Sequence, residues 1–510
     1  MLKLLTISGF LSLGSLSMSQ RLWVWILPIL VLAGGVYAGY RVFARQPEAR
    51  QFDATVVEAA SAQANAAAAA SPRDPRFTLE VRRFGVTVDR FRQRAVLLRL
   101  DESGPNGTLL LQDPKEYPWS AMDRMSADGQ RENNVFGYTL RGWLGFWPIP
   151  VIVAGPPRDE KDKDAGRMAT HISSADNGAG IGNPLYIQLD ELHTEHGDDV
   201  VERLFDFFDQ HPDLPAAVVL IEDGLNTRAY MHTPGEDVTL QNKNGNFVPA
   251  RPDSFVALLV TRKDRVDRSI RPYVVDVPEA VDNEKTQYDV IKLWNYFWSL
   301  QEGYWKNGKE AMPWNYWQSK LPEFWKTTPL KAPEGFKPNP WVPVPWTKWQ
   351  LEEYDNWPVL AYLHRPVRVD LTNGHGELLK KGERIEKLKA GWHDALQTLP
   401  SGEQPGRIFY DTGASTQNLA LLIQSLHDNP QHIDLDDPKD AFDMQRRIGG
   451  DTGTSSIWVQ LALGLMMGYG DGKTNALINL RDPSHATIVM LTPPDAASRQ
   501  AHPQVFSWDF

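Results

Sequence analysis

Short hydrophobic runs separated by turn residues divide the chain after about residue 76 into expected strands. The stretch FTLEVRRFGVTVDR, at 77–90, alternates apolar and polar residues as a half-buried strand does, and AVLLRL, at 95–100, is expected to follow as a continuous strand. Residues 198–210 carry apolar positions at helical spacing behind two acidic residues, which predicts a helix. Further buried strands are predicted at 148–157, 216–223, 256–262 and 273–277. Strands that alternate with helices indicate a largely parallel or mixed α/β sheet.

A similar alternation returns toward the C-terminus. RIFYD, at 407–411, predicts a strand, and residues 415–429 predict an amphipathic helix that begins at a serine cap, Ser415. Residues 455–470 are apolar all round, which is typical of a helix buried on every side, and their uncharged run is too short for a membrane span. Two more strands are predicted at 474–480 and 486–495. We therefore expect a second α/β region, although no internal repeat stands out in the sequence.

The segment between these two regions has a different composition. Ten of the eighteen tryptophans lie between positions 291 and 357, and prolines crowd the later half of that stretch. Helical spacing holds only at its start, and the proline-rich remainder must be extended or turning. Tryptophan is favoured where one ring edge is buried and the other meets a polar partner. The rings are therefore expected either to fill a seam between the α/β regions or to form a surface for a partner or carbohydrate. The candidate partner-binding residues are Trp294, Trp298, Trp305, Trp314, Trp317 and Trp346.

A long uncharged stretch stands near the N-terminus. Nineteen residues from Leu22 to Tyr40 carry no charge, and an arginine flanks them on each side. A helix of this length spans a hydrocarbon core of ~30 Å. Tryptophans at one end and tyrosines at the other suit the membrane interface. We expect a transmembrane helix at 22–43, rather than a signal peptide or a buried helix, after a leader at 1–21.

The charges around this stretch favour one orientation. Arg41, Arg45 and Arg50 follow the span, whereas Lys3 and Arg21 precede it, and Lys3 is lost if translation starts at the second methionine of the leader. Because basic residues are retained on the cytoplasmic side, the body of the protein is expected there. The protein is thus predicted to be cytoplasmic, or anchored in the inner membrane through residues 22–40 with its body in the cytoplasm.

The residues after the span suggest how the chain is organised. Residues 44–75 are rich in alanine and end with prolines, which favours a tether that is partly helical or flexible, with a docked helix as the alternative. The predicted domains are then an N-terminal α/β domain at 76–285, a connecting segment rich in tryptophan and proline at 286–364, and a C-terminal α/β domain at 365–510.

Composition excludes several classes of function. A net charge of −11 argues against a general nucleic-acid binder, which needs a basic surface. The absence of cysteine removes disulfides, cysteine-ligated zinc, iron–sulfur clusters and thiol nucleophiles. The balance of 42% hydrophobic and 23% charged residues is that of a folded protein.

Two similar motifs, Asp411-Thr-Gly-Ala-Ser415 and Asp451-Thr-Gly-Thr-Ser, resemble the paired loops of aspartic proteases. Such enzymes need two close carboxylates that share one proton. Here the motifs are only forty positions apart with a predicted helix between them, which does not suit a two-lobed β protease. We interpret them as turns and caps that open two helices. Asp411 nevertheless ends a predicted strand, where α/β proteins tend to bind ligands.

Other motifs are incomplete. The segment 468–474 resembles a phosphate loop but is one residue short and follows a helix instead of a strand. His193, Glu195 and His196 offer two imidazoles and a carboxylate, but the sequence marks no third metal ligand beside them, and we interpret them as a solvated helix start. No complete catalytic, cofactor or metal constellation is found, so no cofactor is expected.

Three long segments carry a resemblance to a known family. Residues 117–148 (YPWSAMDRMSADGQRENNVFGYTLRGWLGFWP), 292–305 (KLWNYFWSLQEGYW) and 409–422 (FYDTGASTQNLALL) resemble bacterial type VI lipase adapter proteins, which were first catalogued as a domain of unknown function. The likeness covers most of the chain after about residue 76, as an N-terminal and a C-terminal adapter domain. The resemblance implies a cytoplasmic adapter that binds a phospholipase toxin and loads it onto the type VI spike protein.

Two hypotheses follow from the sequence. The first is the non-catalytic adapter that the resemblance implies, with the aromatic segment as its expected partner surface. The alternative is a membrane-anchored envelope hydrolase or ligand-binding protein with a site near Asp411, Ser415 and Asp451.

Overall fold

The computed structural model describes residues 50–69, 73–142, 145–159, 185–237, 239, 245–277, 288–306, 312–427 and 433–506. Within these ranges, no helix is both long and apolar enough to cross a bilayer. The predicted leader at 1–21 and transmembrane helix at 22–43 lie outside the described residues.

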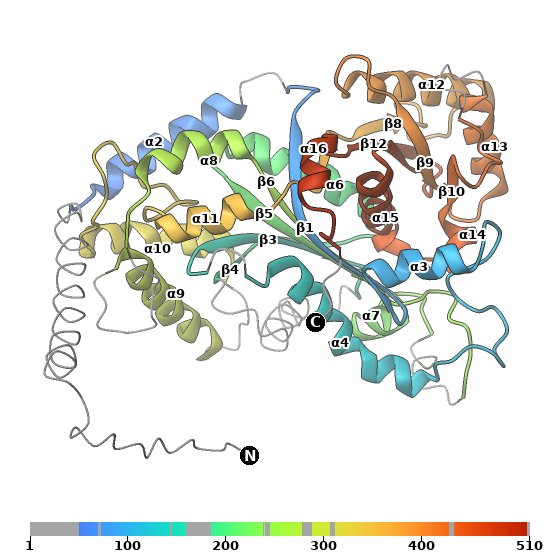
Figure 1. Ribbon diagram of the computed structural model, residues 1–510, viewed down its shortest axis with the longest axis horizontal. Helices are drawn as coiled ribbons and strands as arrows, with labels where there is room; N and C mark the ends of the chain where they lie inside the picture. The colour runs from blue at the N-terminus through green and yellow to red at the C-terminus, as the bar shows by residue number, and fades with distance from the viewer. Residues whose placement is uncertain are drawn as a thin grey trace, which may run out of the picture.

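The strands join into one large mixed sheet (Figure 1), whose spatial order is β10-β9-β11-β12-β7-β1-β6-β5-β3-β4, with β2 beside β1 and β8 beside β12. The predicted mixed α/β class is confirmed, but the two α/β regions share this sheet instead of forming two. The strands are β1 Thr78–Val88, β2 Phe91–Arg92, β3 Pro148–Gly155, β4 Leu185–His193, β5 Ala216–Asp223, β6 Ser254–Thr261, β7 Ala361–His364, β8 Val367–Asp370, β9 Pro405–Asp411, β10 Ala441–Asp443, β11 Thr474–Asn479 and β12 His485–Thr492.

The two halves of the sheet repeat one topology. In the N-terminal half, β4, β3 and β5 are parallel neighbours, and β6 runs antiparallel between β5 and β1. In the C-terminal half, β10, β9 and β11 are parallel, and β12 runs antiparallel between β11 and β7. The halves meet where β1 pairs with β7, from Thr78 opposite His364 to Val81 opposite Ala361. The structure therefore contains a repeat that the sequence does not reveal.

Helices cover this sheet, and two of them occupy corresponding places in the two halves. Helix α6 follows β4, and α15 follows β10 after the short α14 and η4; α6 and α15 contact each other. The helices are α2 Ala54–Ala69, α3 Arg94–Glu102, α4 Ala121–Leu140, α6 Gly197–Gln210, α7 Leu225–Tyr230, α8 Lys263–Ser269, η3 Arg271–Tyr273, α9 Asp289–Lys306, α10 Trp314–Thr327, α11 Lys348–Asn356, α12 Lys381–Gln397, α13 Thr416–Leu426, α14 Met444–Ile448, η4 Gly453–Ser455, α15 Ser456–Asp471 and α16 Ala496–Ala501.

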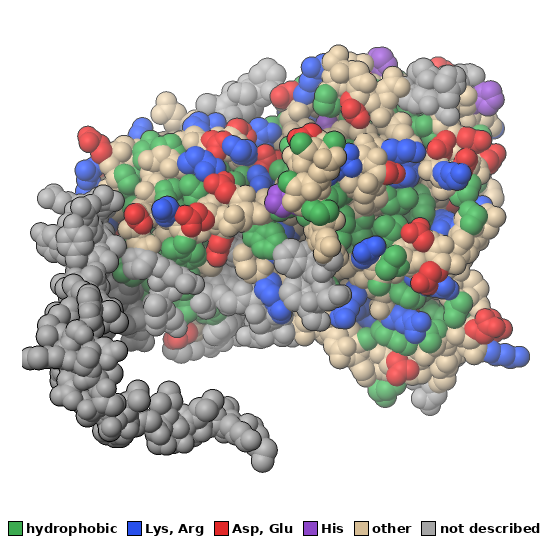
Figure 2. Space-filling view, viewed as in Figure 1, with side chains coloured by type: hydrophobic (Ala, Val, Ile, Leu, Met, Phe, Trp, Pro, Cys, Tyr) green, Lys and Arg blue, Asp and Glu red, His purple; other side chains and the backbone are tan. Residues whose placement is uncertain are grey.

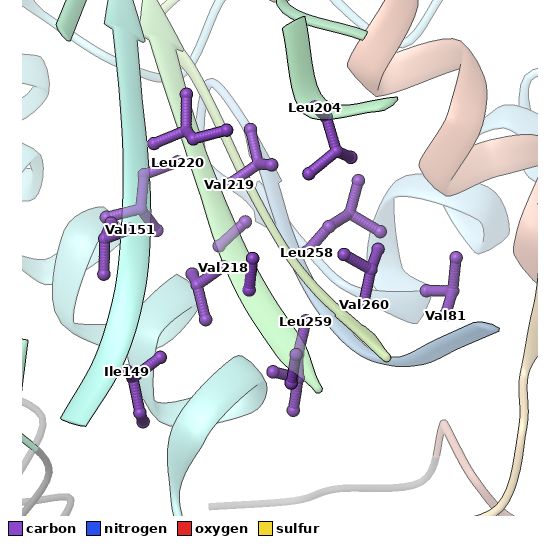
Figure 3. Packing of buried hydrophobic residues seen from close by; sticks show 14 of the residues in the cluster. Val81, Ile149, Val151, Leu204, Val218, Val219, Leu220, Leu258, Leu259 and Val260 are labelled. Carbon is purple, nitrogen blue, oxygen red and sulfur yellow. The ribbon is translucent and has the colours of Figure 1, made fainter. Parts of the chain in front are cut away.

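The hydrophobic core extends across both halves. Its main cluster packs aliphatic side chains of β1, β3, β5 and β6 against α6, as Figure 3 shows for Val81, Val219 and Leu204. The same cluster includes Trp458 of α15 and Leu491 of β12, so the C-terminal half contributes to it. A smaller cluster lies under α12 and α13. As predicted, α15 is buried nearly all round, because it contacts strands of both halves.

Most predicted elements are present, but one expected strand is a helix. AVLLRL lies in α3, where Val96 and Leu100 are buried one turn apart and Leu98 is 45% exposed. Gln93 explains the change of structure: its side chain accepts a hydrogen bond from Val86 N at 2.7 Å and donates one to Phe84 O at 3.0 Å. These bonds close the β1–β2 hairpin just before the helix begins.

Two further predictions within the described residues were wrong. Residues 273–277 form no strand: they follow η3 and make only an isolated bridge, between Val275 and Thr347. Helix α10 was not expected, because helical spacing was seen only at the start of the tryptophan-rich segment, and this helix contains Pro322. Burial of Trp317, Leu321, Phe324 and Trp325 on this helix outweighs the unfavourable proline.

The alanine-rich segment contains a helix that touches the body. Helix α2 contacts α10 and α6, and its Val57 is buried. A helix that docks on the body is the alternative to the tether, and the contacts of residues 54–69 agree with it. Whether residues 44–75 also act as a tether stays a prediction, as do the domain boundaries.

Candidate functional site

The six tryptophans named as candidate partner-binding residues do not share one environment. Trp317 and Trp346 are fully buried in the main core cluster and leave almost no ring surface for a partner. Trp294, Trp298 and Trp314 are partly buried against the core, and Trp314 stacks on Trp341 with the ring centroids 3.6 Å apart. The side chain of Trp305 lies outside the part of the chain that the structure describes. Among the members of this set whose side chains are described, the partly buried Trp294, Trp298 and Trp314 present ring surface to solvent.

The two Asp-Thr-Gly motifs meet at a single arginine. Asp411 ends β9, and Arg481 follows β11, its parallel neighbour. Arg481 Nη1 lies 2.9 Å from Asp411 Oδ2 and 2.7 Å from Asp451 Oδ1. The parallel pairing of β9 and β11 places Asp411 and Arg481 at one edge of the sheet, and the loop before α15 brings Asp451 to the same arginine.

Each motif also caps its own turn. Gly413 N donates to Asp411 Oδ1, and Gly453 N donates to Asp451 Oδ1, both at 2.8 Å. Ser456, the first residue of α15, donates its hydroxyl to Asp411 Oδ2. Ser415 is the N-cap of α13, as predicted, and accepts a hydrogen bond from Asn418 N. The turn interpretation therefore agrees with the hydrogen bonds of both motifs, but the cap interpretation agrees only for the first, because Ser455 at the start of α15 makes no side-chain capping bond.

Electrostatics keep Asp451 ionised. Burial alone would raise the pKa of Asp451, but the charge and hydrogen bond of Arg481, with the hydrogen bond from Gly453 N, lower that pKa to about 2. The charges of Asp411 and Asp451, and their hydrogen bonds with the guanidinium, raise the pKa of Arg481 despite its burial. A strongly acidic carboxylate held by a guanidinium is a poor proton donor or acceptor near neutral pH.

A second arginine cluster borders the first and ties the halves together. The buried Arg228 contacts Asp223 at 2.7 Å, Glu195 at 2.7 Å and Glu236 at 3.1 Å. Asp223 also accepts a hydrogen bond from Thr454 N, which belongs to the C-terminal half. The carboxyl ends of β4, β5, β9 and β11 thus meet in one charged centre.

Two histidines lie beside this centre. His485 Nε2 is 3.1 Å from Asp198 Oδ2, and His196 Nε2 is 3.2 Å from Asp482 Oδ2. Ser484 Oγ lies 3.2 Å from His485 Nδ1, which completes a chain of serine, histidine and carboxylate. Burial would lower the pKa of His485, but the hydrogen bond and charge of Asp198 outweigh it and raise that pKa. A raised pKa increases the share of protonated His485 near neutral pH, and a protonated imidazole cannot accept the hydroxyl proton of Ser484.

The sequence missed most members of this centre. It singled out Asp411, Asp451, Glu195 and His196, but not Arg481, Arg228, Asp198 or His485. The only signal for Arg481 is its position just after a predicted strand, which many charged residues share. His193, in the same motif as His196, pairs instead with Glu191 at 2.9 Å, away from this centre.

The fold and this centre define a mixed α/β protein of two topologically equivalent halves, each with a cluster of ion pairs at the carboxyl ends of its strands, linked by the hydrogen bond from Thr454 N to Asp223. The model of the type VI lipase adapter protein Tla3, N-terminal, matches residues 77–242, and the model of the type VI lipase adapter protein Tla3, C-terminal, matches residues 360–493. The chain belongs to the type VI lipase adapter protein Tla3 family. The predicted resemblance is thereby confirmed.

Solved structures offer a weaker comparison. A variant of OleA from Xanthomonas campestris bound with cerulenin is 11% identical, with a TM-score of 0.38 over 83% of this chain and 99% of that one. A cerulenin-soaked OleA from the same organism is 10% identical, with a TM-score of 0.37 over 82% of this chain and 99% of that one. Similarity this low supports no conclusion about activity.

Proposed function

We propose that this chain is a non-catalytic adapter that binds a phospholipase toxin and loads it onto the type VI spike protein. The observation that carries the proposal is the match of both family models, one on each half of the sheet. Because the two halves share a core, the adapter acts as one rigid body that presents its surfaces in fixed positions.

The charged centre supports a structural role for the Asp-Thr-Gly motifs. A protease dyad needs two carboxylates that share a proton, whereas Arg481 lies between Asp411 and Asp451 and contacts both. The two carboxylates are therefore bridged by the guanidinium of Arg481. This arrangement favours the adapter over the alternative of a hydrolase at Asp411, Ser415 and Asp451.

The toxin surface is proposed to include the partly exposed rings of Trp294, Trp298 and Trp314. Aromatic side chains that are half buried supply large contact areas at a small entropic cost. An interface of ordinary size would bury on the order of 1,200–2,000 Å². Figure 2 shows positive and negative side chains interspersed over the face in view, which carries no large field of one sign.

Loading is proposed to occur in the cytoplasm, with the body free or held at the inner membrane through residues 22–40. Affinity purification of the full chain from its own host, followed by mass spectrometry, tests the binding step. We expect recovery of a phospholipase together with a spike component.

The variant Asp411→Asn separates the adapter from the enzyme. Asparagine retains the shape of the side chain, so a folded variant should recover the phospholipase as the wild type does. The proposal fails if the wild type recovers neither partner but hydrolyses an ester or peptide substrate, and Asp411→Asn abolishes that activity.

A further inference from the structure

Three side chains from the two halves converge on one point beside the charged centre. His196 and Asp198 lie where β4 passes into α6, and His485 begins β12. One possible ligand atom from each of the three lies within 4.8 Å of the others, and the two imidazole rings have centroids 5.4 Å apart. The sequence showed only His196 of this set, because the other two ligands come from the next turn and from nearly three hundred residues away.

The spacing of these atoms suits a metal ion. Around a tetrahedral zinc ion, neighbouring donor atoms are about 3.3–3.5 Å apart. Within the set, His485 Nε2 lies 3.1 Å from Asp198 Oδ2, close to this value, and His196 Nε2 lies 3.2 Å from a carboxylate outside the set, Asp482 Oδ2. Two imidazoles with a carboxylate are donors for zinc and similar transition metals, whereas calcium and magnesium prefer oxygen alone.

The charges around the cluster also suit a divalent cation. With both histidines neutral, Asp198 and Asp482 supply two negative charges, which balance a dication. The nearby cation Arg368 is already paired, at 2.9 Å from Asp199 and 3.7 Å from Glu202. The ion would therefore be neutralised by its own ligands and their neighbours.

The ligands are held in place by a second layer of hydrogen bonds. Asn479 donates to Asp198 Oδ1 at 3.1 Å, and Thr487 donates to Asp198 Oδ2 at 2.6 Å. Ser484 Oγ contacts the far nitrogen of His485. Such partners orient metal-binding carboxylates and imidazoles and tune their affinity. His196 is 38% exposed, which gives an ion a route from solvent.

We propose that His196, Asp198 and His485 form a binding site for a zinc-type divalent transition metal, with Asp482 beside it as a further donor. Since His196 and Asp198 belong to the N-terminal half and His485 to the C-terminal half, the ion stabilises the junction between the halves. This site is independent of the proposed adapter function, because the tryptophans of the proposed toxin surface lie on α9 and α10.

The test uses the full chain without a polyhistidine tag, stripped with a chelator. Zn²⁺ binding is measured by isothermal titration calorimetry, and Co²⁺ binding by its visible absorption. We expect one equivalent of Zn²⁺ per chain and a higher melting temperature with excess Zn²⁺, because the ion binds the folded state. His196→Gln and His485→Gln should each weaken binding by about tenfold or more.

His193→Gln is the matched control. His193 also pairs with a carboxylate, three residues before His196, but lies outside the cluster, so this variant should bind Zn²⁺ as the wild type does. If His485→Gln fails to fold because Asp198 loses its partner, His196→Gln decides alone, since it leaves that pair intact. The proposal is overturned if the folded wild type binds no stoichiometric Zn²⁺, or if His196→Gln binds it unchanged.

Discussion

Arg481 is the residue on which the charged centre depends. Its guanidinium is mostly buried and contacts one carboxylate from each Asp-Thr-Gly motif, and Asp411 is almost wholly buried. A buried ion pair contributes little by itself, but removing one partner leaves a charge without solvation. The position of Arg481 therefore fixes how β9, β11 and the loop before α15 meet.

Replacing Arg481 by methionine should lower the free energy of unfolding by about 3–5 kcal/mol, because Asp411 would stay buried without a cation. Urea unfolding measures this change. The control is Arg73→Met, which removes a cation that is 65% exposed and pairs with Asp206. An exposed pair contributes roughly 0–1 kcal/mol. A loss of less than about 1 kcal/mol in Arg481→Met would contradict the structural role of this arginine.

His364 should make stability depend on pH. Burial lowers its pKa from 6.5 to about 4, although the hydrogen bond with Thr398 O opposes this. The folded state therefore binds a proton less readily than the unfolded chain, and stability is lost as pH falls from about 6.5 toward about 4. Between pH 7 and pH 5 the wild type should lose about 2 kcal/mol more than His364→Gln, as measured by urea unfolding. Equal losses in the two proteins would show that His364 protonates normally in the fold.

At the scale of elements, the pattern of hydrophobic residues predicted a helix or strand well where the element buries one of its faces. Helices α6 and α13 agree with their hydrophobic periodicity, whereas β1 is a strand as predicted but is buried on both faces and not half-buried. The failures arise where a distant or unusual contact decides the structure. The side chain of Gln93 closes a hairpin and turns an expected strand into α3, and buried aromatic residues keep α10 helical through Pro322.

The crossing of α4 over β1 depends on one glycine. A Cβ atom at Gly85 would lie 2.4 Å from Val135 O and 2.7 Å from Val135 Cα, and backbone atoms cannot move aside easily. Gly85→Ala should therefore lower the free energy of unfolding by about 1–3 kcal/mol, measured by urea unfolding.

Gly129 offers a control within α4 itself. A Cβ atom there meets no other atom within 4 Å, so Gly129→Ala should stabilise the protein by up to about 1 kcal/mol through helix propensity. If the two alanine variants shift stability in the same direction, α4 does not cross β1 as closely as described.

At the scale of the whole molecule, the sequence predicted the class and the family but not the way the halves combine. The repeat of topology leaves no visible sequence repeat, because a fold constrains where residues are apolar more than which residues they are. The charged centre draws on segments around residues 195, 228, 411, 451 and 481. Only their folding brings them together, so the sequence marked two motifs without their shared partner.

The halves should not fold independently. Helix α15 contacts α6, β1 and β6 of the N-terminal half as well as its own strands, so a chain from residue 359 to the C-terminus would expose a large apolar face. We expect this fragment to aggregate or to lack a cooperative unfolding transition, and to become soluble when coexpressed with residues 1–358. Circular dichroism and size-exclusion chromatography report both outcomes. A monomeric fragment that unfolds cooperatively by itself would contradict a shared core.

We propose above all that this chain delivers a phospholipase toxin to the type VI spike without acting on a substrate. The most direct measurement is the amount of phospholipase that co-purifies with tagged spike protein from host cells with and without this chain. We expect that deletion of this chain abolishes the co-purification. Reintroducing either the wild-type chain or the Asp411→Asn variant should restore it. Undiminished loading of the toxin in cells that lack the chain would contradict the proposal.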